Sequence, residues 1–499
     1  MFGPLDARGV APALVAAALL LPPPTLGQPV PNAPWPMMGH DARHTGRTTV
    51  VPANPALRGT IKWIYDPNDT HNDPDEVDAI HAGAAIGPDG KLFFGTTHGR
   101  FICLNKATGQ RLWSYPPPSQ PPASAHEQGV YGTPALGVAY SAGGDGLDGP
   151  PGQELYNVYF TTDDGRLWCF RADGSLVWIR QVGEAIGGSP VIGSNGRIYV
   201  AWSNGATRKA YVSAYDAAGT SKWVQELPAH PTQLVGVIAG PAVGDNGTVY
   251  VGDTLGRLHA VVDRGTYGEL KWPNPYKNPA GAPGVHCEPV IGDDGTIYYT
   301  TFYQQVGNGL HAVVDNGLYQ APSSKWHHDT YMPLDFLTSV AGPLGLEAVD
   351  PVEGGPFLDW TAEGARIWFG TFVGGPSRFI RVEECTEPGD PPPRWAEGVV
   401  VTDHPLINNV DAVGACARWY DAEGRMQQAI VIAYEEPIVY SFRLEAHFPA
   451  PVYWWRLLYP TFPDTIERPQ LSIDSDGTVY VGSSHPRYRS GRLFAIWGP

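Results

Sequence analysis

The chain has 499 residues, and its composition excludes several classes of protein. Sixty glycines and 50 prolines indicate many turns, while 16 tryptophans and 24 tyrosines supply large apolar side chains that disordered chains lack. The 33 Lys and Arg residues stand against 50 Asp and Glu residues, so the net charge is −17. Such a charge repels phosphate groups and favours solubility, and we expect no nucleic-acid partner.

The N-terminal residues predict export. Residues 10–21 form an apolar run that is too short to span a bilayer, and three prolines and the small residues Thr25 and Gly27 follow it. This pattern is typical of a signal peptide covering residues 1–27, so the mature protein is expected in the periplasm or outside the cell. No later segment is long and apolar enough to predict a transmembrane helix. A monomer is expected.

A six-residue motif, Gly-Thr-Val-Tyr-Val-Gly, occurs at residues 247–252 and again at 477–482. Close variants occur elsewhere, and most copies follow an Asp-Gly or Asn-Gly pair. Alternating apolar residues after such a pair predict a β-hairpin. The pairs are Asp89-Gly90, Asn195-Gly196, Asn246-Gly247, Asp294-Gly295 and Asp476-Gly477.

Each hairpin belongs to a longer unit of four predicted strands. A short strand opens most units at a residue followed by proline, and a third strand and a fourth strand with a tryptophan follow the hairpin. Such repeats predict the blades of a β-propeller, because a single blade cannot bury its faces without neighbours. We expect the tryptophans to pack between blades, with ligand stacking as the alternative. They are Trp113, Trp178, Trp223, Trp272, Trp326, Trp395 and Trp455.

The predicted fold is all-β: an eight-bladed propeller in residues 57–499, after an N-terminal extension of residues 28–56. Seven blades is the competing count, because the sixth and seventh units are degenerate. The last unit lacks its closing strand, and residues 59–65 are expected to supply it and so to close the ring. The eight units begin near Gly83, Thr133, Ser189, Gly240, Glu288, Gly342, Asp411 and Arg468.

The five cysteines are scattered along the chain, which favours packing over disulfide bonds. Cys103 and Cys169 occupy a position of the repeat where a small buried side chain is expected. Other units have Ala260, Ala312 and Ala495 at this position. A disulfide bond between Cys385 and Cys416 is the alternative that the spacing leaves open.

Three segments resemble known repeats. Residues 103–113 and 214–223 resemble the tryptophan-docking motif of pyrroloquinoline-quinone (PQQ) proteins, which has Ala, Asp, Thr-Gly and Trp at these spacings. Residues 35–46, Trp-Pro-Met-Met-Gly-His-Asp-Ala-Arg-His-Thr-Gly, also resemble a segment that is common in PQQ-like repeat proteins. The resemblance covers residues 35–499 and implies a propeller of the superfamily that contains quinoprotein alcohol dehydrogenases and BamB-like proteins.

This resemblance implies two functions, and neither matches fully. The dehydrogenases use PQQ and Ca²⁺, an Asp base and a disulfide between adjacent cysteines, whereas no two cysteines are adjacent here and no motif places the base. The lipid-anchoring cysteine of BamB-like proteins is not found before Cys103. We therefore expect a non-catalytic binding or scaffolding propeller, to which the sequence assigns no cofactor, and a quinoprotein-like oxidoreductase with PQQ and Ca²⁺ is the alternative.

The candidate binding site is one mouth of the central channel, where a protein partner or a small ligand is expected. Polar residues that precede the first strand of each unit should converge there. We expect Glu288 and Asp411 to bind a cation or a proton, His81 and His286 to carry protons, and Arg468 to bind an anionic group. The alternative is a solvated rim with ordinary ion pairs. The full candidate set is His81, Glu127, Tyr131, Glu184, His286, Glu288, Asp411, Glu467 and Arg468.

An acidic segment, residues 66–78, is a weaker candidate for Ca²⁺ binding. Its oxygen-bearing side chains suit this ion, but the EF-hand spacing fails because the sixth residue is His71 and the twelfth is Val77. An exposed acidic loop is the competing interpretation. The candidate ligands are Asp66, Asn68, Asp73 and Asp75.

Overall fold

The computed structural model describes most of the chain. The described residues are 28–52, 54–67, 79–117, 129–139, 156–277, 284–301, 309–329, 355–359, 366–370, 378–383, 394–395, 399–400, 414–433, 438–443, 452–458, 470–483 and 491–498. Their regular structure is β-strand throughout, which confirms the predicted all-β propeller class. Within these ranges, no helix is long and apolar enough to cross a membrane. The predicted signal peptide lies outside them.

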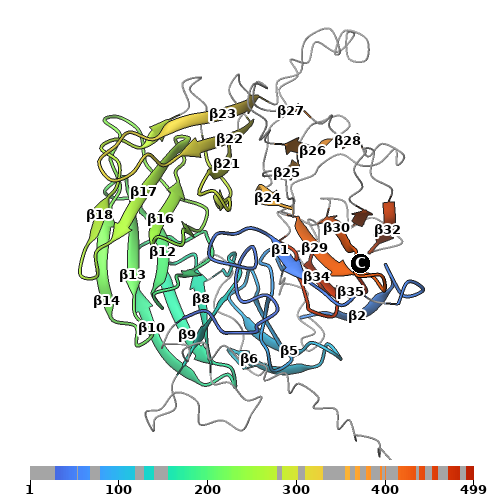
Figure 1. The fold of residues 1–499 in the computed structure, drawn as a ribbon. Helices are drawn as coiled ribbons and strands as arrows, with labels where there is room; N and C mark the ends of the chain where they lie inside the picture. Colours follow the sequence, from blue (N-terminus) through green and yellow to red (C-terminus); the bar gives the residue numbers. More distant parts are fainter. Residues whose placement is uncertain are drawn as a thin grey trace, which may run out of the picture.

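Hydrogen bonds group the described strands into eight sheets, here numbered along the chain and arranged around a central axis (Figure 1). Sheet 1 contains β3 (Ala85–Ile86), β4 (Lys91–Gly95), β5 (Phe101–Asn105) and β6 (Arg111–Tyr115). Sheet 2 contains β7 (Ala135–Val138), β8 (Tyr156–Thr162), β9 (Arg166–Arg171) and β10 (Leu176–Gln181). Sheet 3 contains β11 (Val191–Ile192), β12 (Ile198–Asn204), β13 (Lys209–Tyr215) and β14 (Ser221–Glu226).

The next three sheets continue this order. Sheet 4 contains β15 (Ala242–Val243), β16 (Thr248–Gly252), β17 (Arg257–Asp263), β18 (Gly268–Leu270) and β19 (Tyr276–Lys277). Sheet 5 contains β20 (Val290–Ile291), β21 (Ile297–Thr301), β22 (Gly309–Val314) and β23 (Ser323–Asp329). Sheet 6 contains β24 (Phe357–Leu358), β25 (Arg366–Gly370), β26 (Arg378–Glu383), β27 (Arg394–Trp395) and β28 (Val399–Val400).

The last two sheets each include a strand from the N-terminal part of the chain. Sheet 7 contains β29 (Ala415–Tyr420), β30 (Met426–Ala433), β31 (Ile438–Arg443) and β32 (Val452–Leu457), and β1 (Arg47–Thr49) pairs in parallel with β29. Sheet 8 contains β33 (Ser472–Ile473), β34 (Val479–Gly482) and β35 (Leu493–Ile496). Its outer strand is β2 (Ile61–Tyr65), in which Trp63 lies opposite Ala495.

The Asp-Gly and Asn-Gly pairs form the predicted hairpin turns between the first and second strands of their sheets. The glycines of these turns have φ between 74° and 81°, a left-handed conformation that glycine adopts without strain. They are Gly90, Gly196, Gly247, Gly295 and Gly477.

One cross-strand register recurs from sheet to sheet. An aromatic residue on the second strand lies opposite a small residue on the third, which lies opposite the tryptophan of the fourth; in sheet 3 these are Tyr199, Ala214 and Trp223. Cys103 and Cys169 hold the small position in sheets 1 and 2 and are fully buried, as predicted. Burial raises the pKa of both thiols.

Cys416 is buried on β29, where its backbone pairs with β1. The alternative disulfide bond between Cys385 and Cys416 stays a prediction. Cys385 lies outside the described residues. The packing interpretation therefore holds for the cysteines that can be compared.

Each docking tryptophan joins its sheet to the next one. The indole N–H of Trp178 donates to the carbonyl of Ala217 at 3.0 Å, and a Cβ on Gly219 would lie 2.7 Å from the Trp178 ring. Packing between sheets thus accounts for the predicted tryptophans of sheets 1 to 5. The side chains of Trp395 and Trp455 are not described. The other described indole contacts are Trp63 with Lys106, Trp113 with Ala172, Trp223 with Asp263 and Trp272 with Asp315.

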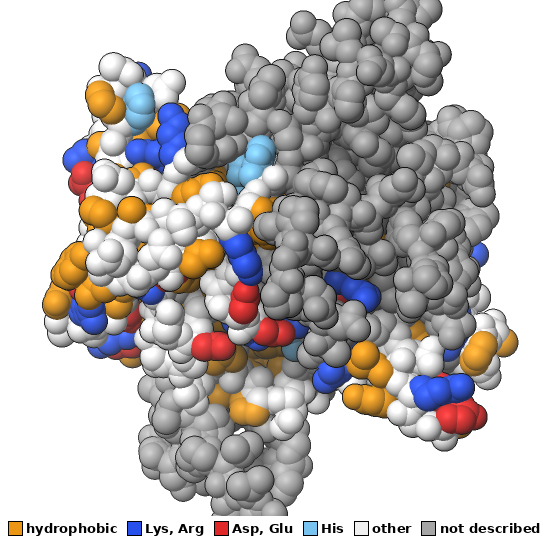
Figure 2. All heavy atoms as spheres, turned by 45° about the horizontal axis from the view of Figure 1, so that its top comes forward, with side chains coloured by type: hydrophobic (Ala, Val, Ile, Leu, Met, Phe, Trp, Pro, Cys, Tyr) orange, Lys and Arg blue, Asp and Glu red, His pale blue; other side chains and the backbone are white. Residues whose placement is uncertain are grey.

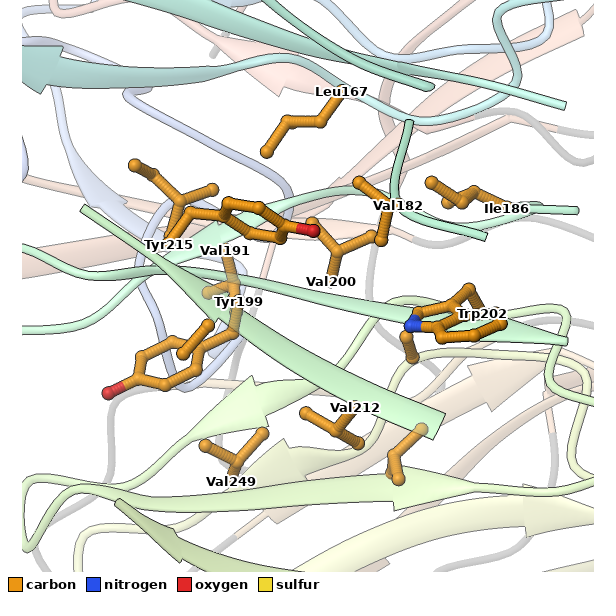
Figure 3. Close-up of a cluster of buried hydrophobic side chains, with 14 of the residues drawn as sticks. Leu167, Val182, Ile186, Val191, Tyr199, Val200, Trp202, Val212, Tyr215 and Val249 are labelled. Atoms are coloured by element: carbon orange, nitrogen blue, oxygen red, sulfur yellow. The ribbon is translucent and has the colours of Figure 1, made fainter. Parts of the chain in front are cut away.

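Apolar side chains fill the space between neighbouring sheets. In Figure 3, Leu167 of β9 and Val249 of β16 lie on either side of residues from β11, β12 and β13, so one cluster spans sheets 2, 3 and 4. Tyr199 at its centre is fully buried. This stacking buries both faces of sheet 3, which no isolated sheet could do.

Candidate functional site at the hub

The N-terminal extension crosses the middle of the propeller and is not a separate appendage. We call residues 35–51 the strap; it belongs to the dark blue segment at the centre of Figure 1. Strap carbonyls accept hydrogen bonds of 2.7–2.9 Å from the inner strands of six sheets. The pairs, donor first, are Ile86 with Trp35, Leu136 with Pro36, Val243 with Ala42, Ile291 with Arg43, Leu358 with Thr45 and Cys416 with Gly46.

The strap follows the ring by means of tight local turns. Gly39, His40, His44 and Gly46 all have positive φ, between 57° and 74°, so the strap bends sharply. Asp41 fixes one bend, because its Oδ1 accepts from the backbone N–H of Arg43 at 2.9 Å and its Oδ2 accepts from the Thr45 hydroxyl at 2.5 Å. Partial burial alone would raise the pKa of Asp41, but hydrogen bonds and the charge of His40 lower it to about 2.

Two arginines fasten the strap to the hairpin turn of sheet 5. Arg47 donates two hydrogen bonds to the Asp293 carboxylate, at 2.9 and 2.7 Å, and only 7% of its side chain is exposed. Arg43 lies 3.1 Å from the same carboxylate. The strap therefore lies on the side of the channel where the first hairpin turns are, opposite the predicted mouth.

A ring of single residues lies just inside that mouth. Each is found two positions before the inner strand of its sheet, and we call these positions the hub. Six of the seven described hub residues are uncharged, and Glu288 is the exception. The hub residues are Gly83, Thr133, Ser189, Gly240, Glu288, Gly355 and Gln470, while Val413 lies outside the described residues.

Hydrogen bonds connect the hub across several sheets. The N–H of Gly240 donates to Glu288 Oε1 at 3.3 Å, and the Ser189 hydroxyl lies 3.5 Å from the same oxygen. Ser189 Oγ accepts from the N–H of Thr133 at 3.0 Å, and the Thr133 hydroxyl donates to Gln470. The backbones approach closely here, since a Cβ on Gly240 would lie 2.4 Å from the Ser189 carbonyl oxygen.

His44 brings the strap to the hub. Its ring is 3% exposed, and its Nδ1 lies 3.3 Å from the carbonyl oxygen of Pro289, the residue after Glu288. Burial lowers the pKa of His44, although the charges of Glu288 and Asp41 oppose this effect. Its Nε2 is buried and has no hydrogen-bond partner. The hub thus combines a buried carboxylate with a neutral imidazole.

The structure brings together only part of the predicted mouth. His81 and Tyr131 are in edge-to-face contact, with ring centroids 5.8 Å apart. His286 precedes the hub residue Glu288 by two positions, which places it near the mouth. The remaining members Glu127, Asp411, Glu467 and Arg468 lie outside the described residues.

Glu184 is engaged within its own sheet. Its carboxylate accepts from the Asn204 side chain at 2.9 Å and from the N–H of Gly205 at 3.0 Å, so it caps the turn after β12. It lies seven residues before β11, whereas His81 and His286 lie four residues before the inner strands of their sheets. Turn capping therefore accounts for Glu184.

The acidic segment is described only at its start. Asp66 accepts a hydrogen bond from Arg492 Nε at 2.9 Å, so its carboxylate is already paired with a cation. Asn68, Asp73 and Asp75 lie outside the described residues. The Ca²⁺ prediction for this segment therefore gains no support from Asp66.

Sequence reasoning missed His44 and Gln470. In the last unit the prediction took Arg468, which precedes a proline, as the equivalent of Glu288, but the hub residue is Gln470. In this unit the residue before proline lies four positions before the inner strand, whereas Glu288 lies two positions before its inner strand. His44 lies in the segment that resembles the family, and no repeat pattern predicted that this segment reaches the hub.

A cavity of about 560 Å³ lies between sheets 4 and 5, beside their first hairpin turns. Its cations are engaged: Lys271 contacts Asp315 at 2.5 Å, and Lys325 contacts Asp294 at 2.8 Å. Asp245 is its most exposed carboxylate. These pairs tie strands and turns together, and so the hollow is explained by the packing of the two hairpins.

Some exposed apolar side chains lie on the outer strands beside the docking tryptophans, one or two to a strand. Figure 2 shows hydrophobic side chains interspersed with charged ones over the described part of one face. Single exposed apolar residues are normal on soluble proteins and indicate no partner. Examples are Ile64, Leu112, Val177 and Val224.

Comparison with solved structures finds propellers of quinoprotein dehydrogenases. The quinohemoprotein alcohol dehydrogenase ADHIIG from Pseudomonas putida HK5 is similar with a TM-score of 0.53 and 12% identity, over 94% of this chain and 80% of that chain. A europium-containing methanol dehydrogenase is similar with a TM-score of 0.55 and 11% identity, over 93% of this chain and 98% of that chain. At such identities the likeness concerns the fold alone.

Sequence comparisons cover less of the chain. A family model described as outer membrane protein assembly factor BamB matches residues 141–325. The dehydrogenase subunit of a quinone alcohol dehydrogenase from Gluconacetobacter polyoxogenes is 38% identical over 72 residues, which are 14% of this chain and 10% of that protein. The quinohemoprotein alcohol dehydrogenase ADH-IIG from Pseudomonas putida gives the same values. This chain thus matches about a tenth of the length of these curated relatives.

The described hub residues do not fit the Ca²⁺ ion that the family resemblance implies. Ca²⁺ takes about six to eight oxygen ligands. In the described part of the chain, no group of three or more His, Cys, Asp or Glu residues is placed to hold a metal ion. Glu288 and Gln470 already accept hydrogen bonds from the backbone N–H groups of Gly240 and Gly83. The hub residues therefore support no reaction step through a bound Ca²⁺ ion.

Proposed function

We propose that this chain is an exported binding protein of the PQQ-like repeat superfamily and that its ligand site lies at the hub. The match of residues 141–325 to the BamB family model and the propeller fold support the superfamily. The observation that carries this proposal is Glu288, a buried carboxylate whose partners within 3.5 Å among the described residues are neutral donors. A buried charge without an opposite charge is costly, and sites of this kind usually serve a ligand. The strap supports the proposal by delivering His44 to the same place.

The expected effect of a ligand is stabilisation of the folded state. A small-molecule screen by thermal shift on the purified chain should give compounds that raise the melting temperature of the wild type, because binding favours the folded state. The same compounds should not stabilise Glu288→Gln. The control is Glu226→Gln, which alters a half-exposed surface ion pair with Lys209. Ligands that stabilise both variants equally would contradict a hub site.

The eight sheets are proposed to form one closed ring of eight blades. Pairing of β2 with β35 supports this count, and so does Trp63, whose indole donates to the carbonyl of Lys106 in sheet 1 at 3.0 Å. Deleting residues 59–65 should expose the edge of β35 and cause loss of soluble protein or a large fall in melting temperature. A truncated chain that melts like the full chain would contradict closure by this strand.

A quinoprotein-like oxidoreductase is the second candidate, and the relatives favour it over a non-catalytic role. The curated relatives are named quinone or quinohemoprotein alcohol dehydrogenases, and the similar structures carry related names. The test is an absorbance spectrum and an alcohol-dependent dye-reduction assay after incubation with PQQ and Ca²⁺. Alcohol-dependent turnover would establish the oxidoreductase and overturn the binding-only proposal.

Export and a monomeric state complete the proposal. The signal-peptide pattern in residues 1–27 supports export, and so does the match to a family described by an outer-membrane assembly role. The partner is expected to be a protein or a small ligand at the mouth. Fractionation of the native host and size-exclusion chromatography of the purified protein test these two points.

A further inference from the structure

Glu288 is the starting point, because no described residue places a positive charge against its carboxylate. The side chain is 7% exposed, and it occupies the one charged position among the described hub residues. None of the ion pairs formed among described residues includes Glu288, and its Oε1 interacts with the neutral donors Gly240 N–H and Ser189 Oγ. Carboxylates are rarely buried without a compensating cation. The site therefore lacks a positive charge that a ligand would supply.

His44 adds a second acceptor beside this carboxylate. A carbonyl oxygen can only accept a hydrogen bond, so the contact of Nδ1 with the Pro289 carbonyl requires the proton on Nδ1. In the neutral ring Nε2 then carries a lone pair, and it is buried without a hydrogen-bond partner among the residues that the structure describes. An orphaned acceptor of this kind indicates a missing donor. The Glu288 carboxylate and His44 Nε2 would therefore both be stabilised by a group that donates hydrogen bonds and carries a positive charge.

The nearby strap charges do not compensate Glu288. Asp41 interacts electrostatically with His44 and is ionised at neutral pH, which makes the hub more negative. Arg43 and Arg47 both face the Asp293 carboxylate in the hairpin turn, at 3.1 Å and 2.7 Å. The positive charges of the strap are therefore already paired on the opposite side of the channel from the mouth.

We propose that the hub binds a compact cation of the primary ammonium type, held between the Glu288 carboxylate and His44 Nε2. This inference rests on the proposed hub binding function and names its ligand class. A primary ammonium group carries one positive charge and three N–H donors, so the Glu288 carboxylate would balance its charge, and the carboxylate and His44 Nε2 would both accept its hydrogen bonds. A divalent metal ion requires more ligands than the described residues bring together. An anion would meet a carboxylate and a lone pair and would be repelled.

The experiment compares two cations of equal charge that differ in their donors. Methylammonium chloride donates three hydrogen bonds, whereas tetramethylammonium chloride donates none. At matched ionic strength, isothermal titration and thermal shift on the full chain should show saturable binding of methylammonium and at least a tenfold weaker response to tetramethylammonium. Glu288→Gln should lose the response, and the surface variant Glu226→Gln should keep it.

His44→Asn tests the second acceptor. Asparagine tolerates the left-handed backbone of this position, where φ is 57°, but it does not carry the imidazole Nε2. We expect methylammonium to bind at least threefold more weakly to this variant while the melting temperature of the ligand-free chain changes little. If Glu288→Gln does not fold, ¹⁵N-labelled methylammonium and the wild-type chain give a direct NMR readout, with contacts expected between the ammonium protons and an imidazole ring.

Three outcomes would overturn the proposal. Equal binding of both cations, or unchanged methylammonium binding by Glu288→Gln, would show that the hub does not recognise an ammonium group. Stabilisation by micromolar Zn²⁺ or Ca²⁺ that depends on Glu288 would replace the ammonium by a metal ion and leave the hub binding function standing. If the hub variants alter neither these responses nor any ligand from the wider screen, both proposals fail together.

Discussion

The docking tryptophans and the hub are both repeated positions, yet they behave in opposite ways. The docking position holds tryptophan in sheets 1 to 5, where its indole or ring packs against the next sheet. The hub position holds Gly, Thr, Ser, Gly, Glu, Gly and Gln in the seven sheets where it is described. The docking position is the same in these sheets because every interface between sheets needs a large side chain there. The hub position need only fit the middle of the ring, and so its residue can differ from sheet to sheet.

This difference tells where to look for function in a repeat protein. The residues that recur explain the fold, because each sheet must bury the same faces against its neighbours. The residue that departs from its equivalents is the informative one, and Glu288 is the clearest such departure in the hub. The predictions that follow alter one side of this contrast at a time.

The largest effect is expected from removing a docking tryptophan. Trp178→Ala deletes a buried ring between sheets 2 and 3 together with its hydrogen bond to the Ala217 carbonyl, and should lower the free energy of unfolding by about 3–5 kcal/mol. Val177→Ala is the matched control, because this neighbour on β10 is 41% exposed and should cost less than about 1 kcal/mol. Urea unfolding measures both, and similar losses would contradict the docking role.

The glycine under a docking tryptophan should matter more than a glycine in an open turn. Gly219 and Gly247 have nearly the same φ, 76° and 75°, but a Cβ on Gly219 would lie 2.7 Å from the Trp178 ring, and a Cβ on Gly247 would meet nothing within 4 Å. Gly247→Ala should therefore cost only the backbone strain, about 1–2 kcal/mol. Gly219→Ala should cost about 1 kcal/mol more. Equal losses in urea unfolding would show that the ring yields freely.

The sequence predicted the outer parts of the repeat better than its centre. The Asp-Gly turns, the small position of Cys103 and the packing of the tryptophans could be predicted, because each recurs at a fixed position of the repeat. The path of the strap does not, since Arg43 and Ile291 meet although they are far apart in sequence. No periodicity signals such a contact. Glu288 was found because it opens a repeat, whereas His44 was missed because it lies outside the repeats.

The strap should depend more on its buried arginine than the surface does on an exposed one. Arg47 donates to both oxygens of Asp293 and is nearly buried, so Arg47→Ala should lower the free energy of unfolding by about 1–2 kcal/mol. Arg425, which pairs with Asp421 at 2.9 Å, is 69% exposed, and Arg425→Ala should change stability by less than about 0.5 kcal/mol. If thermal and urea unfolding give equal changes, the strap is not fastened by Arg47.

The smallest effect concerns two aspartates whose pKa values move in opposite directions. Burial raises the pKa of Asp163, in the turn after β8, from 3.8 to about 6, and its Oδ1 is buried without a hydrogen-bond partner. The folded state therefore holds this proton more tightly than the unfolded state, so the contribution of Asp163 to stability is present below about pH 4 and is lost as the pH rises through 6. Asp163→Asn removes this loss. Because the group is only half-buried, the variant should gain on the order of 1 kcal/mol relative to the wild type between pH 4.5 and 7.5.

The pKa of Asp41 in the strap is shifted in the opposite direction. Its pKa is lowered to about 2, so its contribution to stability is present above about pH 4 and is lost as the pH falls toward 2. Asp41→Asn should therefore be less stable than the wild type at neutral pH, by on the order of 1 kcal/mol, and the difference should shrink as the solution is acidified. Urea unfolding at several pH values measures both variants. If the two differences changed with pH in the same direction, the strap aspartate would not be the anchor that its hydrogen bonds to Arg43 and Thr45 indicate.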